Sequence, residues 1–336
     1  MLGGTGKVMA SSTTLNVKNL AALGAERLAA LLIETSKGNA AAKTRLRLAL
    51  AEAQGSGDVA REVAKRLTSI AGGRARITWR RRKKLVEDLE TQRRAIIDQV
   101  APSDPAEALE LAWRFLALAT PVFQRCDDSS GTVIAVFHAG LRDLGEIAKR
   151  AEADPQLLAD SVFSALQNNA FGQYDGLIAI LAPVLGDAGL TRLEQRVEEI
   201  AGEGPLRGAT REQARRDDIA RRAVRDIADA RGDVDAYIAQ YDARARTTPQ
   251  VATAIASRLL KAGRPDDALA IIEDTQIDRD GFVPEAWKHT RLAVLEALGR
   301  DDEAQALRWR FFEAELSVAF LRDYLKKLPD FDDIEA

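Results

Sequence analysis

The chain has 336 residues, which is enough for one large domain or for two ordinary ones. Hydrophobic residues make up 46% and charged residues 29%, a balance that excludes an intrinsically disordered chain, and the net charge of −3 excludes a nucleic-acid-binding polycation. The single cysteine, Cys126, excludes an internal disulfide framework and any zinc site built on several thiolates. No apolar run approaches the roughly 18 residues that cross a bilayer, and no leader peptide is recognised. We therefore expect a cytoplasmic protein without membrane contact.

The charge is distributed unevenly along the chain. Residues 1–100 contain 19 Lys and Arg against 9 Asp and Glu, a net charge of +10, whereas residues 101–336 contain 29 against 42, a net charge of −13. Such asymmetry indicates either a basic interaction surface or two halves of the chain that face each other.

Residues 1–14 are predicted to be a disordered extension. From residue 15 onward, apolar side chains recur at helical spacing, and helix follows helix up to a candidate linker at residues 202–208. We expect residues 15–204 to form an irregular helical bundle or solenoid. The first helical stripe ends at Lys37–Gly38 and consists of Leu20, Leu23, Leu28, Leu31 and Leu32.

A longer helix is predicted over residues 79–100. Its spacing places Trp79, Val86 and Leu89 on the inner face and leaves basic side chains on the outer face, so that no aromatic platform is expected there. Asp104–Pro105 is a strong start signal for the next helix, because an N-cap aspartate precedes a proline in the first turn. No convincing strand pattern is found, and the predicted fold class is all-α.

Internal repeats indicate the architecture of the C-terminal half. Leucine-rich segments end at Gly263–Arg264 and at Gly299–Arg300, each is followed by aspartates and an alanine-containing helix, and the two glycines are 36 residues apart. The glycine is expected to adopt the left-handed C-cap conformation and the aspartate to cap the following helix. This period is close to that of tetratricopeptide repeats. We predict an α-solenoid of helical hairpins, with tetratricopeptide-like repeats and an acidic tail over residues 205–336.

Three segments carry a family resemblance: Cys126–Gly131 with His138, Gly172–Gly176, and Tyr324–Asp333. With these segments the chain resembles an uncharacterised bacterial helical-repeat family, a domain of unknown function, over about residues 9–336. It is more distantly similar to the helical regions that accompany SWIM zinc fingers. The finger itself needs three cysteines and a histidine, so its metal and nucleic-acid role does not transfer to this chain. The resemblance implies a helical fold and no particular activity.

Seven cations lie within residues 74–84, and four of them, Arg80, Arg81, Lys83 and Lys84, are candidate partner contacts. One interpretation is contact with the phosphates of a nucleic acid. The alternative is a solvated helix face that pairs with Glu87, Asp88 and Glu90, or that docks against the acidic half of the chain.

Two polar loops are candidates for a ligand or contact site. The first contains Asp127, Asp128, Ser129 and Ser130, with His138 about two turns into the following helix, and the second contains Gln173, Tyr174 and Asp175. A small-ligand or enzymatic site shared by the two loops is one hypothesis. The simpler hypothesis is that Asp128, Ser129 or Ser130 caps the next helix, while Cys126 is a small buried residue.

The leading functional prediction is a non-catalytic interaction or scaffold protein that binds a partner segment on a helical-repeat surface. The first alternative is a nucleic-acid-associated module that uses residues 74–84, and the second is the small-ligand or enzymatic site at the two polar loops. No cofactor and no metal site are expected. A protein partner is expected, and a second copy of the chain is a further candidate partner.

Overall fold

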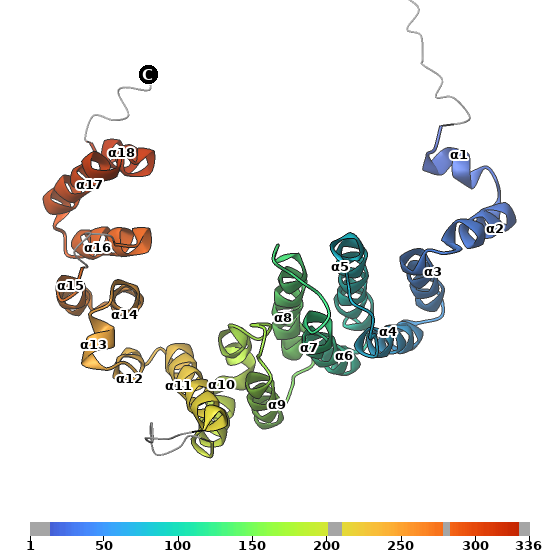
Figure 1. The fold of residues 1–336 in the computed structure, drawn as a ribbon, viewed down its shortest axis with the longest axis horizontal. Helices are drawn as coiled ribbons and strands as arrows, with labels where there is room; N and C mark the ends of the chain where they lie inside the picture. The colour runs from blue at the N-terminus through green and yellow to red at the C-terminus, as the bar shows by residue number, and fades with distance from the viewer. Residues whose placement is uncertain (1–13, 201–209, 278–282, 329–336) are drawn as a thin grey trace, which may run out of the picture. The chain divides into compact units, whose positions relative to one another are not determined.

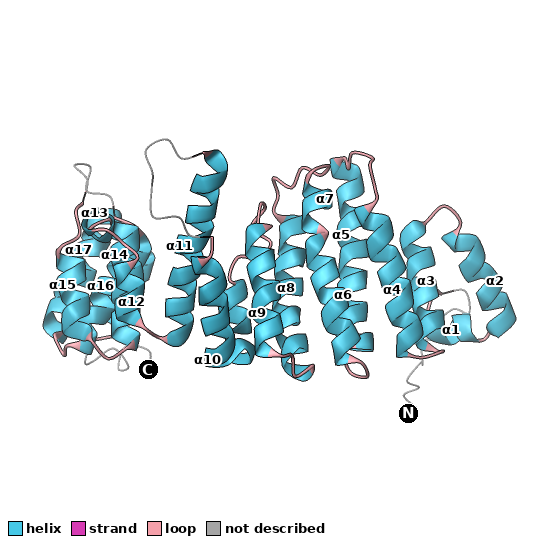
Figure 2. Cartoon of the chain, turned by 90° about the horizontal axis from the view of Figure 1, so that it is seen from below, coloured by secondary structure: helices cyan, strands magenta, loops and turns pink. Residues whose placement is uncertain are grey.

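The computed structural model describes residues 14–200, 210–277 and 283–328. Within these ranges the chain is helical and contains no strand, which confirms the all-α prediction (Figure 2). A single isolated bridge joins Ile77 to Cys126, where the Ile77 N–H donates to the Arg125 carbonyl at 2.8 Å. The predictions for the N-terminal extension up to residue 13, for the linker at 202–208 and for the acidic tail lie outside the described residues.

The contacts along the chain divide it into two compact units; Figure 1 labels the helices of both. Unit 1 comprises residues 1–154 and 168–184, and unit 2 comprises residues 155–167 and 185–336. The helix α10 (Leu177–Glu198) contributes to both units and is interrupted at Gly186, whose φ of 53° and ψ of −167° are not helical. No helix in the described ranges is long and apolar enough to cross a membrane.

Unit 1 is built from consecutive helices that pack mainly on helices close to them in sequence. Besides the first part of α10, its helices are α1 (Val17–Ala21), α2 (Ala25–Ser36), α3 (Ala40–Glu52), α4 (Ser56–Ala71), α5 (Trp79–Arg94), α6 (Pro105–Ala117), α7 (Ala119–Phe123) and α8 (Thr132–Arg150). The expected N-cap of α6 is confirmed, since the Asp104 carboxylate accepts from the Glu107 N–H at 3.0 Å. Helix α8 begins at the β-branched run Thr132, Val133 and Ile134, which is helical although β-branched residues favour strands.

The core of unit 1 is tightest where α6 and α8 cross. The rings of Phe115 and Phe137 are fully buried there, with centroids 5.5 Å apart. Gly140 of α8 permits this close approach, because a Cβ atom at this position would lie 2.7 Å from the Phe115 ring. A glycine is therefore required on this face of α8 for steric reasons.

The helix expected over residues 79–100 consists of α5 and a π-helical segment η1 (Ala95–Val100). Arg93 near the end of α5 is ion-paired with Glu90 of its own helix and with Asp143 of α8. The hydrogen bond from Arg93 lowers the pKa of Glu90 to about 2. This network fixes α5 against α8.

Unit 2 contains a second set of helices, and helices from residue 211 onward contribute to two hydrophobic clusters in the described ranges. Besides the second part of α10, its helices are α9 (Pro155–Gln167), α11 (Arg211–Arg231), α12 (Val234–Ala239), α13 (Ala243–Arg246), α14 (Pro249–Lys261), α15 (Pro265–Glu273), α16 (Glu285–Ala297), α17 (Asp301–Glu315) and α18 (Val318–Leu325). Trp287 and Ile255 belong to one cluster, and Phe320 belongs to the other.

The turns of the two expected repeats are partly as predicted. Gly263 and Gly299 adopt left-handed backbone conformations with φ of 72° and 69°. The expected aspartate caps are wrong, because Arg264 and Arg300 occupy the N-cap positions and their side chains make no capping hydrogen bond. The acidic residues lie in the first helical turn instead, where Arg300 pairs with Glu303 at 2.6 Å and the helix dipole favours negative charge.

Candidate functional site

The loop before α8 is organised by one carboxylate. Asp128 accepts hydrogen bonds from the backbone N–H groups of Val133 at 3.0 Å and Ile134 at 2.9 Å. Asp127 accepts from the Ser129 N–H at 3.0 Å. Of the three capping candidates named from the sequence, Asp128 is therefore the one that binds the free N–H groups at the start of the helix.

Cys126 and His138 contact different parts of unit 1. Cys126 is buried, and burial raises the pKa of its thiol, an effect that the Asp128 carboxylate reinforces. The His138 Nε2 atom lies 2.9 Å from the carbonyl oxygen of Gly172. His138 is therefore hydrogen-bonded to the second polar loop. The raised pKa means that the Cys126 thiol is protonated at neutral pH and is not activated as a nucleophile. Ser130 hydrogen-bonds the adjacent hydroxyl of Thr132 at 3.1 Å.

The second polar loop is held together by hydrogen bonds among its own residues. The Asn169 amide donates to Asp175 at 2.7 Å, and its oxygen accepts from the Tyr174 N–H at 2.9 Å. The Gln173 side chain is buried and donates to the Asn168 carbonyl at 2.7 Å. These hydrogen bonds hold residues 168–176 in a compact turn ahead of α10. They also provide partners for buried polar groups of the turn, which would otherwise be left unsatisfied.

Among the titratable candidate residues of the two polar loops, Tyr174 is the most buried, with 5% of its surface exposed. Its side chain lies beside Trp113, with ring centroids 6.3 Å apart, and burial raises its pKa to about 12. The phenol is therefore neutral at physiological pH. In the described ranges, no three His, Cys, Asp or Glu side chains gather as the ligands of a metal ion would.

The predicted partner contacts Arg80, Arg81, Lys83 and Lys84 lie in the first two turns of α5, and all four are exposed. None of them is ion-paired with a carboxylate in the described ranges. Arg82 differs, because it is half-buried and donates to the Asp127 carbonyl at 3.0 Å. The four exposed cations therefore keep their charge available to solvent.

The prediction that Trp79 points into the core is wrong, since its side chain is 73% exposed. Trp79 is the first residue of α5, and helical side chains lean toward the N-terminal end of their helix. Because α5 has no turn before Trp79, the indole has no helical surface of its own helix to pack against and extends into solvent. Arg80 approaches the ring, with its guanidinium carbon 5.3 Å from the ring centroid.

A cleft of about 350 Å³ opens beside these cations, among α4, α5 and the segment that joins them. Asp88, which pairs with Arg66, is the only carboxylate in its lining. The Arg125 guanidinium donates to the Ile70 carbonyl at the end of α4 at 2.7 Å. The cations that line the cleft are Arg66, Arg76, Arg81, Lys84 and Arg125.

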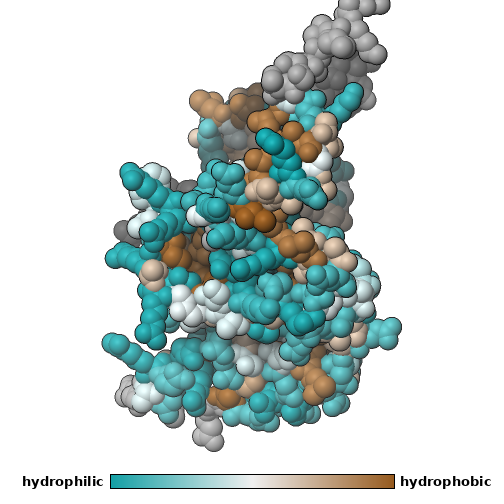
Figure 3. Space-filling view, turned by 90° about the vertical axis from the view of Figure 1, so that its right-hand side faces the viewer, coloured by the Kyte–Doolittle hydropathy of each residue, from teal (hydrophilic) through white to brown (hydrophobic). Residues whose placement is uncertain are grey.

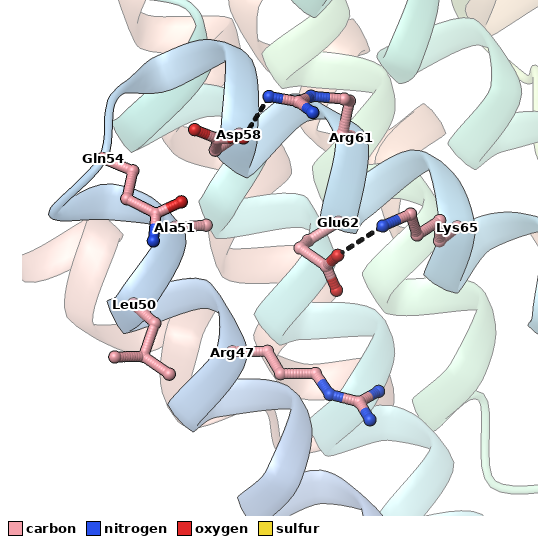
Figure 4. Close-up of a pocket in the computed structure, with 8 residues that line it drawn as sticks. All are labelled: Arg47, Leu50, Ala51, Gln54, Asp58, Arg61, Glu62 and Lys65. Carbon is pink, nitrogen blue, oxygen red and sulfur yellow. Dashed lines mark hydrogen bonds and ion pairs between the residues drawn. The ribbon is translucent and has the colours of Figure 1, made fainter.

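A second cleft, of about 470 Å³, lies between α3 and α4 (Figure 4). Its charges are largely paired within α4, since Asp58 pairs with Arg61, and Glu62 pairs with Lys65 at 2.8 Å. Leu50 of α3 adds an apolar side chain that is 66% exposed. This cleft therefore combines apolar and charged groups, which distinguishes it from the cationic cleft at α5.

Sequence reasoning missed the exposed apolar surface at the N-terminal end of unit 1. The helix α1 buries no residue, and α2 buries only Ser36. The leucine stripe predicted these helices, and most of its side chains are open to solvent. We call this region the N-terminal apolar surface; its members, between 37% and 66% exposed, are Leu20, Leu23, Leu31, Leu32, Ile33 and Leu50.

These features describe an all-α protein whose unit 1 carries the cationic cleft at α5, the cleft between α3 and α4, and the N-terminal apolar surface. The chain matches a family of unknown function, DUF6880, over residues 10–336, and it therefore belongs to that family. No curated protein and no solved structure matches the chain. The expected membership in a domain family of unknown function is thus confirmed, whereas the distant similarity to SWIM-associated helical regions stays a prediction.

Proposed function

We propose that this chain is a non-catalytic interaction protein, an α-solenoid of helical hairpins with tetratricopeptide-like pairs in its C-terminal half. The packing of helices on their near neighbours in sequence supports the solenoid. The left-handed glycines 36 residues apart, each between two packed helices, support the repeat pairs. With a single cysteine and no internal disulfide framework, we also propose a cytoplasmic location.

The N-terminal apolar surface carries this proposal. Eight of the fifteen large hydrophobic side chains that are most exposed in the described ranges lie between residues 15 and 50. Figure 3, which faces the N-terminal helices, shows apolar side chains among polar ones on this side. Exposed apolar side chains concentrated at one end of a protein are a common mark of a protein-binding site.

The charge around this surface specifies the partner. Residues 14–71 contain nine Lys and Arg against five Asp and Glu, so the helices that carry the apolar side chains are net basic. The segment that fits is therefore an apolar stretch flanked by acidic residues, supplied by another protein. Apolar contacts supply most of the affinity in such a complex, and the opposite charges set the orientation.

The test compares three full-length proteins: wild type, the double variant Leu31→Asp/Leu32→Asp, and Val318→Asp as a control. Val318 is also exposed, at 66%, but it lies in unit 2. Each protein is used for nuclease-treated affinity purification from the native cell, and the captured protein is then purified and titrated against all three. Circular dichroism checks that the variants fold.

We expect the captured protein to bind wild type and the Val318 variant equally, and to bind the double variant at least tenfold more weakly. Burial of each leucine is worth about 1.5–3 kcal/mol, and tenfold is about 1.4 kcal/mol. Equal binding to all three proteins would overturn the proposal. A dimer seen by sedimentation in wild type and lost in the double variant would also overturn it, in favour of a second copy of the chain.

A further inference from the structure

A second surface of unit 1, separate from the N-terminal apolar surface, bears an excess of positive charge. It comprises the start of α5 and the segment before it, and we call its members Arg76, Arg80, Arg81, Lys83 and Lys84 the α5 cation cluster. All five side chains are exposed, and none pairs with a carboxylate in the described ranges. A cluster of like charges without internal partners is stabilised when an anion binds to it.

The cationic cleft gives this charge a concave site. Arg76, Arg81 and Lys84 of the cluster line this cleft together with Arg66 and Arg125. Gly73 lets the guanidinium of Arg125 lie close to the backbone, since a Cβ atom there would be 2.5 Å from Arg125 Nη1. The walls are therefore fixed by structural contacts, while the three cations of the α5 cluster remain available to a ligand.

Trp79 adds an aromatic platform at the rim of this surface. Its indole is 73% exposed, and Arg80 lies near the ring. An exposed aromatic ring next to free cations is the combination that single-stranded nucleic acids require, because bases stack on the ring while cations contact the backbone. The helical spacing predicted that Trp79 lies on the inner face of the helix, and for that reason the sequence did not indicate an aromatic platform here.

We propose that the α5 surface binds single-stranded nucleic acid, with backbone phosphates in the cationic cleft at Arg76, Arg81 and Lys84 and with an unpaired base stacked on Trp79. This inference goes beyond the proposed protein-partner function and uses different residues. The exposed indole favours a single strand over a duplex, because the faces of paired bases are covered by their neighbours in the stack.

The surroundings of Trp79 argue against a membrane surface as the ligand. In residues 51–156, Trp79 is the only large hydrophobic side chain among the most exposed ones. A helix that lies in a bilayer interface presents a whole apolar face, with several large side chains. The α5 surface offers one aromatic ring among cations, which suits a base better than a layer of acyl chains.

The test uses fluorescence anisotropy with a fluorescein-labelled 20-nucleotide oligothymidine and an oligouridine of equal length, titrated with the full-length protein from 50 to 200 mM salt. The variants are Trp79→Ala, and Arg81→Glu with Lys84→Glu. The matched control is Lys149→Glu with Arg150→Glu, which makes the same charge change at the exposed end of α8. Each variant is checked by circular dichroism.

We expect Trp79→Ala to weaken binding about tenfold without changing the salt dependence, because stacking is not an ionic contact. The Arg81/Lys84 variant should weaken binding and lower the slope of log affinity against log salt by about 1.4, since each phosphate contact contributes about 0.7. The α8 control should behave as wild type.

Four results would overturn the inference or its stacking step. The first is no binding at 50 mM salt, and the second is an equal loss in the α8 control, which would indicate unspecific charge attraction. The third is displacement of the oligonucleotide by polyglutamate as effectively as by an unlabelled strand, which would assign the surface to an acidic protein. Preference for a duplex of equal length would likewise refute the stacking role of Trp79.

Discussion

The clearest structural prediction concerns Asp128, whose hydrogen bonds to two backbone N–H groups at the start of α8 can be removed by the substitution Asp128→Ala. Two backbone N–H groups, those of Val133 and Ile134, would lose their acceptor. Loss of an N-cap side chain costs about 0.5–2 kcal/mol, and loss of a negative charge at a helix N-terminus adds about 0.3–1 kcal/mol. Because Asp128 is half-buried and bonds two amides, we expect a local cost of about 2 kcal/mol.

Hydrogen exchange measured by mass spectrometry is the suitable assay, because a chain with two compact units need not unfold in one step. A local cost of about 2 kcal/mol corresponds to roughly 30-fold faster exchange of the first amides of α8. The control Asp127→Ala removes a carboxylate that bonds one loop amide, and it should change this exchange by less than about threefold. Unchanged exchange in Asp128→Ala would refute the capping role and would favour a ligand contact.

Further predictions concern packing and pH. Gly140→Ala should lower the free energy of unfolding by about 1–3 kcal/mol, because the added methyl group overlaps a buried phenyl ring. Glu90 has a folded-state pKa below its unfolded value, so its pairing with Arg93 should stabilise unit 1 above about pH 4.5 and lose its effect as the pH falls toward 2. Tyr174 has a raised pKa, so its contribution should be present below about pH 10 and lost as the pH rises through 12.

Each of these predictions has a matched measurement. Gly57→Ala is the control for Gly140, since a Cβ atom at Gly57 meets no neighbour within 4 Å, and it should leave stability unchanged or slightly raised in urea titrations. Glu90→Gln should remove part of the acid dependence of stability, and Tyr174→Phe should remove part of the alkaline dependence. A pH profile that is the same in wild type and in either variant would contradict the corresponding prediction.

Features that depend on neighbouring residues in the sequence were predictable. The all-α class follows from helical periodicity, and the Asp104 cap follows from one aspartate, one proline and their order. The capping role of Asp128 was among the alternatives, because a carboxylate before a helix has few other local partners. Cys126 was interpreted as a small buried residue, and the structure confirms that it is buried.

Features that depend on what packs against a helix were not predictable from one sequence. The spacing of Trp79 matched the inner face of α5, but spacing cannot show that the first turn has no neighbour. The leucine stripe of α1 and α2 correctly predicted helices, but its spacing could not show that most of its side chains are exposed. The hydrogen bond between His138 and Gly172 joins residues 34 positions apart, and no periodicity reports such a contact.

The division of the chain has a consequence for how the protein can be dissected genetically. The polypeptide passes between the two units at residues 154–155, 167–168 and 184–185, so unit 1 is not a continuous segment. A fragment that ends at residue 154 would lack the carbonyl that His138 contacts and the buried Tyr174 ring beside Trp113. Truncation mapping of a binding site would therefore confuse loss of the site with loss of the fold. Point substitutions in the full-length chain are the sound way to assign a function to either unit.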